Sequence, residues 1–197
     1  MKNRPAIIVN AILVVLELIA FIHDIYSFGA ETFKWYTVDS NVLQLIVSSL
    51  VLYYYAKGKK LPHYVTVLHF ISAVGLTVTF IIAAFVLAPQ EGFAYYFLEN
   101  VAPINHFIGP LLSVISLLFL EDTEKLPIKV AFYPAAVTLA YGVICLVLNA
   151  LGLLDGPYFF LKVREQSVST IVIWFAIIAV LCISLALIYY KIKYRKK

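Results

Sequence analysis

Charged residues are scarce in this chain of 197 residues. Lys, Arg, Asp and Glu together make up 13% of it, whereas charged residues make up about a quarter of an ordinary soluble domain. Hydrophobic residues account for 63%, and the mean hydropathy is +0.94. A soluble core cannot absorb this excess of apolar side chains, so part of the surface must face lipid. The composition excludes an ordinary soluble domain and predicts an integral membrane protein.

Cysteine is also nearly absent. The two cysteines, Cys145 and Cys182, each lie inside an apolar run, and there is no CxxC pair. This argues against thiol redox chemistry and against a zinc cluster, and it predicts two packed, inert thiols. The chain has no internal repeat, no low-complexity tract and no soluble domain. We therefore expect one transmembrane domain over residues 1–197, without a metal or cofactor.

Six apolar runs have the length of a transmembrane helix, which needs about 20 mostly apolar residues. The first run is too long for a signal-peptide core, and no small-residue cleavage site follows it, so we expect a retained helix. The sequence thus predicts an all-α, polytopic bundle of six transmembrane helices. The predicted spans are 6–26, 37–56, 64–88, 100–120, 128–151 and 167–190.

The lysines and arginines predict the orientation of these spans. Twelve of the fifteen fall in the N-terminus, the second loop, the region of the fourth loop and the C-terminal tail. Only Lys34, Lys162 and Arg164 fall on the other side. By the positive-inside rule, both termini face the cytoplasm. The basic tail fits attraction to anionic lipid headgroups rather than binding of nucleic acid. The short loops and the lean tail favour a microbial plasma membrane.

Polar residues form stripes within three of the predicted spans. Residues three or four apart share a helical face, and polar groups that face lipid tails remain unsatisfied. We therefore expect these stripes to face one another inside the bundle, although similar stripes also join membrane helices that have no catalytic role. The stripes are Thr37, Asn41, Gln44 and Ser48; His106, Gly109, Ser113 and Ser116; and Thr138, Tyr141, Cys145 and Asn149.

Four ionisable residues within the predicted spans are candidates for a functional site: Glu17, Asp39, His69 and His106. A charge inside the bilayer is costly and marks a functional site by default. The spans that carry Thr37 and His106 both begin at the extracellular side. His106 lies roughly 9 Å deeper at 1.5 Å per residue, a difference that a tilt of the helices removes. His69 enters from the cytoplasmic side and falls in the opposite half.

A hydroxyl near an imidazole is the minimum equipment for nucleophilic catalysis. Histidine can accept the proton of Thr37 near neutral pH, and amides such as Asn41 can donate hydrogen bonds to an oxyanion. A histidine in a polar membrane stripe is more often a hydrogen-bonded packing residue. The residues by themselves leave both interpretations open.

Three segments resemble the androgen-induced and androgen-dependent membrane protein family. "WYTVDSNVLQ" resembles the family's "FTxxSNxL" stretch, and "NHFIGPLLSVISLLFLED" resembles its histidine followed four residues later by proline. "LLDGPYFFLKV" resembles the aromatic "YPFL" loop before the last helix. The resemblance implies an intramembrane hydrolase of fatty acid esters of hydroxy fatty acids, with Thr37 as nucleophile and His106 as base.

The chain departs from this family at two places. Animal members carry a second histidine just ahead of the catalytic one, where this chain offers only Asn105 nearby. Asp39 and Ser40 do not align cleanly with the single aspartate of those proteins. Asp39, Asn41 and Asn105 are therefore candidates to orient the imidazole, with Ser40 as a further supporting residue. Aromatic residues of the extracellular loops form a belt at the headgroups or a rim that contacts lipid: Trp35, Tyr36, Tyr158 and Phe159.

Three other functions compete with the hydrolase. A proton-coupled carrier would use Glu17, His69 and His106 as a relay, although no inverted repeat is visible. Haem binding would need histidine pairs on facing spans at matched depth, which His23, His63 and His69 do not provide. A lipid-binding or assembly protein without enzymatic activity would need only the polar stripes.

Overall fold

Every regular element of the computed structural model is a helix, and no strand occurs among residues 3–195, which the structure describes. The predicted all-α class is therefore confirmed. The long helices are α1 (Arg4–Phe28), α2 (Tyr36–Ala56), α3 (His63–Ile82), α7 (Tyr133–Ala150) and α8 (Val168–Tyr194). The short ones are α4 (Ala88–Glu91), α5 (Phe93–Phe97) and α6 (Gly109–Ile115).

Four helical stretches are long and apolar enough to cross a membrane: Arg4–Lys34, His63–Glu91, Ile128–Ala150 and Val168–Tyr194. A fifth apolar stretch, Ile104–Leu120, is shorter. These stretches are compatible with an integral membrane protein. The outward face of α8 is consistent with lipid contact, because it exposes a row of aliphatic side chains that a soluble protein would bury. The row includes Val168, Val172, Ile173, Ile177 and Val180.

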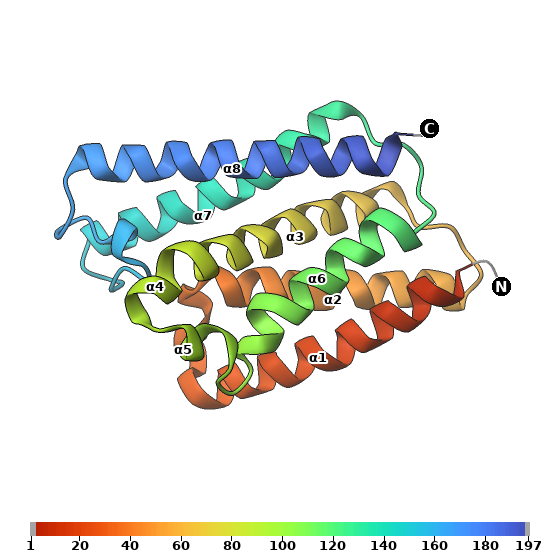
Figure 1. Ribbon diagram of the computed structural model, residues 1–197, viewed down its shortest axis with the longest axis horizontal. Helices are drawn as coiled ribbons and strands as arrows, with labels where there is room; N and C mark the ends of the chain where they lie inside the picture. Colours follow the sequence, from red (N-terminus) through yellow and green to blue (C-terminus); the bar gives the residue numbers. More distant parts are fainter. Residues whose placement is uncertain (1–2, 196–197) are drawn as a thin grey trace.

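The long helices run side by side along the longest axis of the molecule (Figure 1). The start of α1 and the end of α8 lie at the same end of the bundle, together with the α2–α3 connection; we call this the termini end. The short helices α4 and α5 and the α7–α8 connection lie at the opposite end, the loop end. Of the basic residues used for the orientation, Lys2, Lys196 and Lys197 lie outside the described residues.

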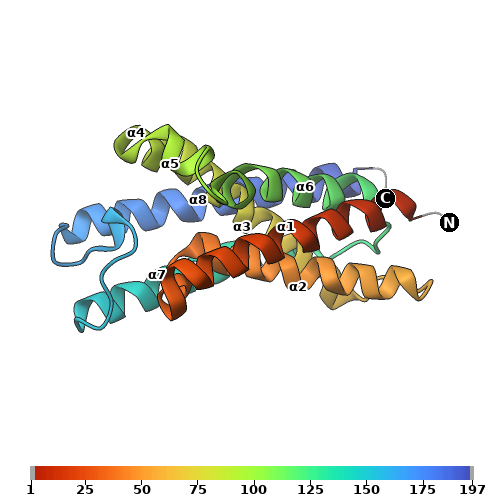
Figure 2. The same cartoon turned by 90° about the horizontal axis from the view of Figure 1, so that it is seen from below.

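Helix α3 is the centre of the bundle. It packs against α2, α6, α7 and α8. It lies between the α1–α2 pair and the α7–α8 pair in Figure 1, and Figure 2 also shows it in the middle of the bundle. Four of its apolar side chains, Phe70, Ala73, Val74 and Leu76, have no exposed surface. Of the four long apolar stretches, the one that contains α3 has the largest share of buried residues, which agrees with its central position.

The span predicted over 100–120 is not one regular α-helix. Wide π-helical turns, η3 (Ile104–Ile108) and η4 (Ser116–Leu120), precede and follow α6. The amide of Gly109 donates to the carbonyl of Ile104, five residues back, and Pro110 has no amide hydrogen to donate. The apolar pattern could not reveal these turns. Such π turns are frequent at functional sites, and this one contains His106.

Candidate functional site

A polar cavity of about 210 Å³ lies at the loop end. Thr37 and His106, which lie in different predicted spans, both line it, together with Trp35, Asn105 and Tyr158. The structure thus brings five of the predicted site residues to one cavity. Further polar lining comes from His23, Asp24, Thr32, Glu91, Glu99 and Asn100.

Thr37 is the second residue of α2, so its amide lies in the first helical turn. The first four amides of a helix have no partner within the helix, and the helix dipole makes this end positive. The N-terminal amides here find other acceptors. The Tyr36 amide donates to Tyr141 Oη at 3.1 Å, and Thr37 bonds the Tyr158 hydroxyl through both its main chain and its side chain. The Thr37 hydroxyl is half-buried, so it is held in place but still accessible.

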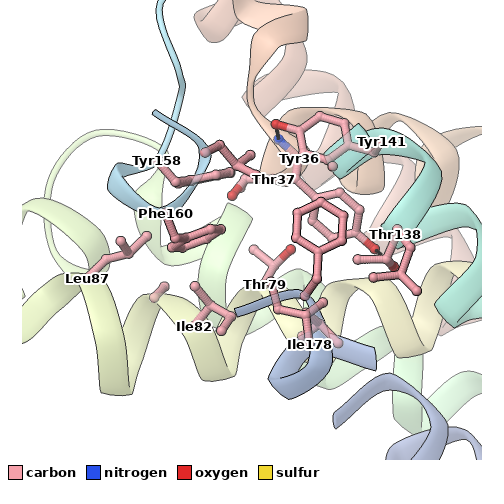
Figure 3. A pocket seen from close by; sticks show the side chains of 16 residues that line it. Tyr36, Thr37, Thr79, Ile82, Leu87, Thr138, Tyr141, Tyr158, Phe160 and Ile178 are labelled. Carbon is pink, nitrogen blue, oxygen red and sulfur yellow. Dashed lines mark hydrogen bonds between the residues drawn. The ribbon is translucent and has the colours of Figure 1, made fainter. Parts of the chain in front are cut away.

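Tyr158 lies in the α7–α8 connection, and its ring reaches Thr37 (Figure 3). Burial raises the pKa of Tyr158 to about 12, although hydrogen bonds from Thr37 and from the main chain of Tyr36 oppose the rise. The phenol therefore keeps its proton at physiological pH and can donate a hydrogen bond. The sequence predicted only an aromatic lipid contact here; the one available signal was the hydroxyl that Phe159 and Phe160 lack.

The His106 ring is held by a hydrogen bond to the main chain of Ala102, by a further interaction with the main chain of Tyr96 and by two aromatic contacts. Its Nδ1 lies 3.2 Å from the carbonyl oxygen of Ala102, which can only accept, so Nδ1 carries the hydrogen. The edges of Tyr96 and Phe97 pack against the ring at centroid distances of 5.5 and 6.1 Å. Nε2 of the neutral ring is left able to accept a proton. Among residues 3–195 no hydrogen bond joins His106 to Thr37, and sites without substrate are often this loose.

Asn41 connects the two segments that carry Thr37 and His106. Its Nδ2 donates to the carbonyl of Thr37 at 2.7 Å and to the carbonyl of Asn105 at 3.2 Å. The Asn105 carbonyl needs this donor, because the Gly109 amide already serves Ile104 and Pro110 has no amide hydrogen. Asn41 therefore holds main chain rather than the imidazole, and both of its amide hydrogens are in use.

Asn105 contacts an acid, Asp24, that is not among the predicted site residues. Its Nδ2 donates to Asp24 Oδ2 at 3.1 Å, and the other oxygen of Asp24 lies 3.3 Å from His23 Nδ1. Asp24 is buried and lines the polar cavity. The available signal was its position seven residues after Glu17, which places both acids on one face of α1.

The other predicted site residues have separate positions. Ser40 donates to the carbonyl of Thr37 at 3.0 Å and lies 3.3 Å from Thr79 Oγ1, so it supports the start of α2. Asp39 lines a different cavity, beside Glu31 and Lys34, and the structure does not bring it to His106.

Of the remaining aromatic residues, Tyr36 is fixed by a 2.7 Å hydrogen bond between its hydroxyl and Thr138 Oγ1. Phe159 packs against Trp174, at a centroid distance of 5.5 Å. It lines neither the polar cavity nor the apolar pocket described next.

An apolar pocket of about 50 Å³ lies beside the polar cavity, between α2, α3, α7 and α8 (Figure 3). Thr37 and Tyr158 line both spaces, and Figure 3 shows them next to each other at one side of the pocket. The remaining walls are mostly aliphatic and aromatic: Val78, Ile82, Leu87, Phe160, Phe175 and Ile178. Thr37 therefore stands where a polar space meets an apolar one.

A second polar cluster is buried nearer the termini end. His69 Nδ1 lies 2.9 Å from Glu121 Oε1, and both side chains have no exposed surface. Ser116 donates to Glu121 at 2.7 Å, and Asn10 Nδ2 donates to Ser116 Oγ at 2.7 Å. The sequence predicts Glu121 in the loop after the fourth span, so it does not predict the pair with His69.

The acid, the histidine and a serine in this cluster follow one another as in a catalytic triad: Glu121 contacts His69 Nδ1, and Ser113 Oγ lies 3.4 Å from His69 Nε2. Ser113 instead donates to Gln44 Oε1 at 2.7 Å, and neither Ser113 nor His69 lines the polar cavity or the apolar pocket. The hydrogen bond to Gln44 confirms that the stripes of the second and fourth predicted spans face each other. We interpret the cluster as packing that joins α1, α2, α3 and α6.

A comparison with protein-family models, with curated proteins and with solved structures finds no match to this chain. The family resemblance of the three sequence segments therefore stays a prediction. Within residues 3–195, no group of three or more His, Cys, Asp or Glu side chains is placed to hold a metal ion. The candidate functional site therefore consists of the polar cavity, the adjoining apolar pocket and the residues that line both.

Replacing Glu121 with alanine should destabilise the protein strongly. The change leaves His69 buried without its acid, and breaking a buried pair costs about 3–5 kcal/mol of unfolding free energy. Unfolding of the purified protein by denaturing detergent, followed by tryptophan fluorescence, measures the loss. The exposed Glu124 in the same connection provides the control, because Glu124→Ala should leave stability unchanged. Equal stability of the two variants would contradict a structural role for the pair.

Proposed function

We propose that this protein is an intramembrane ester hydrolase that uses Thr37 as nucleophile and His106 as general base. One observation supports the proposal above all: Thr37 lies at the junction of the polar cavity, which His106 also lines, and the apolar pocket. An ester of a long acyl chain matches this junction, because an alkyl chain lies on one side of its carbonyl group and the ester oxygen with the alcohol lies on the other. The proposed substrates are fatty acid esters of hydroxy fatty acids or related lipid esters.

The proposed membrane arrangement has six spans, with the termini end in the cytoplasm. The excess of lysine and arginine at the termini end supports this orientation. Helix α2 and the stretch Ile104–Leu120 would be the two less apolar spans, and their polar faces turn inward toward each other at Gln44 and Ser113. The polar cavity then lies near the extracellular headgroups, where water is available. A microbial plasma membrane is the proposed location.

In the first half-reaction, the Thr37 hydroxyl attacks the ester carbonyl carbon while His106 Nε2 takes its proton. The bond between the carbonyl carbon and the alcohol oxygen then breaks. The leaving alkoxide receives the proton from His106, which yields the alcohol and an acyl ester on Thr37. The Nδ1 hydrogen bond to Ala102 supports this role, because it keeps Nε2 as the nitrogen that accepts.

The oxyanion of the tetrahedral intermediate needs hydrogen-bond donors close to Thr37. The neutral hydroxyl of Tyr158 lies at this point and can donate. Tyrosine hydroxyls serve as oxyanion donors in enzymes. Asn41 was a candidate for this role in the sequence, but its amide hydrogens are used by two carbonyls, and the Thr37 amide is directed at Tyr158, so we assign the role to the Tyr158 hydroxyl.

In the second half-reaction, a water from the polar cavity attacks the acyl carbon and gives its proton to His106. The bond to Thr37 Oγ breaks, His106 returns the proton to Thr37, and the fatty acid is released. The apolar pocket suits a single alkyl chain, because its volume is small and its walls are hydrocarbon. The polar cavity suits the alcohol part of the substrate and the water.

A proton-coupled carrier is the second candidate function. The observation that favours it is Glu17, an acid in the middle of α1 whose two carboxyl oxygens have no hydrogen-bond partner among residues 3–195. Unpaired acids inside the membrane often belong to proton relays. In contrast to the hydrolase, the carrier requires that Glu17 can release its proton.

The hydrolase predicts selective reaction with an activity-based fluorophosphonate probe. Wild type should be labelled, whereas Thr37→Ala removes the nucleophile and His106→Ala removes the base, so both variants should lose labelling. In-gel fluorescence of the membrane fraction measures this. Thr32 lines the same cavity, and Thr32→Ala should label like wild type. Labelling that survives Thr37→Ala would remove Thr37 from the mechanism.

Replacing Tyr158 with phenylalanine tests the oxyanion assignment. The variant keeps the ring and loses one donor, so kcat for a fluorogenic long-chain acyl ester should fall roughly a hundredfold while KM changes little. Tyr26, which is 92% exposed at the loop end, provides the matched control, and Tyr26→Phe should have no effect. A kcat for Tyr158→Phe within about twofold of wild type would refute the assignment, because a donor to the oxyanion contributes far more.

The orientation is testable with single new cysteines, since Cys145 and Cys182 are both buried. Glu165, in the α7–α8 connection, and Lys59, between α2 and α3, are exposed at opposite ends of the bundle. A membrane-impermeant maleimide should label Glu165→Cys in intact cells and Lys59→Cys only after the cells are permeabilised. The reverse pattern would invert the proposed topology.

A further inference from the structure

Glu17 lies in the centre of the bundle with 1% of its surface exposed. Neither carboxyl oxygen has a hydrogen-bond partner among residues 3–195, and no ion pair of the described residues includes it. A buried carboxylate without a donor or a cation is very costly, and such a group becomes neutral instead. The groups around Glu17 therefore indicate whether its carboxyl group is protonated.

Beside Gly109, the polar atoms that lie close to the Glu17 carboxyl are acceptors. A Cβ added to Gly109 would lie 2.5 Å from Glu17 Oε1, 2.9 Å from the Ile104 carbonyl oxygen and 3.4 Å from Asn41 Oδ1. The carboxyl thus packs directly on the bare main chain of Gly109, within reach of two other oxygens. Three converging oxygens repel one another unless one of them carries a hydrogen.

The orientation of the Asn41 amide is settled by its own contacts. Nδ2 faces two carbonyl oxygens, so Oδ1 is the atom that turns toward Glu17, and it too is buried without a donor. The titratable group on the same face of α1 is Asp24, seven residues after Glu17 and also buried. From α2 and α6 the groups facing the carboxyl are Asn41 and Gly109, and neither titrates.

We propose that Glu17 is a neutral carboxylic acid that donates its proton to Asn41 Oδ1, and that it acts as a positioning residue for the hydrolytic site. The positioning role rests on the proposed hydrolase. One proton satisfies two buried oxygens that otherwise have no partner. It also fixes the amide that holds the carbonyls of Thr37 and Asn105, and thereby the spacing between the nucleophile and the residue before His106.

Gly109 is part of this arrangement. Its missing side chain makes room for the carboxyl, so alanine at this position would push Glu17 away from Asn41. The glycine, the acid and the amide come from three different helical segments. Their contact therefore joins α1, α2 and the turn that carries His106.

Two substitutions of Glu17 separate positioning from proton transfer. Glu17→Gln keeps a donor to Asn41 Oδ1 and cannot ionise, so the rate of fluorophosphonate labelling should stay within about threefold of wild type. Glu17→Met keeps the length and loses the donor, so labelling should slow roughly tenfold or more, the cost of leaving a buried acceptor unpaired. If Glu17→Gln is as slow as Glu17→Met while both variants remain folded by tryptophan fluorescence, the positioning role is overturned.

The protonation state has a test that does not depend on hydrolysis. The infrared spectrum of the reconstituted protein at neutral pH should contain a protonated carboxyl band that Glu17→Gln removes. Wild type and variant with the same band intensity would refute the neutral acid, whether or not the probe reacts. Failure of wild type to label, with the band present, would refute the proposed hydrolase and the positioning role while leaving the neutral acid established.

Discussion

The arrangement of the site depends on hydrogen bonds to main-chain carbonyl groups in an apolar interior that offers few other donors. Pro110 and the wide turn before it leave the Asn105 carbonyl without a main-chain donor, and the amide of Asn41 supplies one. The same amide bonds the Thr37 carbonyl. An unpaired carbonyl at this depth would cost as much as a lost hydrogen bond, so the two segments are held in one register. Asn41 thereby connects the start of α2, which carries Thr37, to the turn that carries His106.

Polarity changes sharply across Thr37. The polar cavity on one side is lined by histidines, acids and amides, and the pocket on the other side is almost wholly hydrocarbon. Tyr158 borders both spaces and contributes an apolar ring to one and a neutral hydroxyl to the other. A substrate whose reactive bond separates an alkyl chain from a polar group fits this boundary. Neither space alone would suggest an ester.

The buried acids of this bundle have two different environments. Glu121 is fully partnered by His69 and Ser116, so it can be charged and contributes to packing. Glu17 faces only oxygens, so it must be neutral or must receive a cation from elsewhere. In the sequence, Glu17 lies inside a predicted span and Glu121 lies directly after one, and neither position shows the partners of the acid. Their partners, which come from other helices, determine what each acid does.

The composition by itself predicted an integral membrane protein, because so few charges and so many apolar residues exceed what a soluble core can bury, and the long apolar helices are compatible with that prediction. The spacing of Thr37, Asn41 and Gln44 also predicted which face of α2 turns inward, since helical periodicity is local. The π turns, the Asp24 and Glu121 contacts and the hydroxyl of Tyr158 beside Thr37 were decided only by tertiary structure. These depend on which helices meet and at what depth, and a contact between residues 52 or more positions apart leaves no periodic trace in the chain.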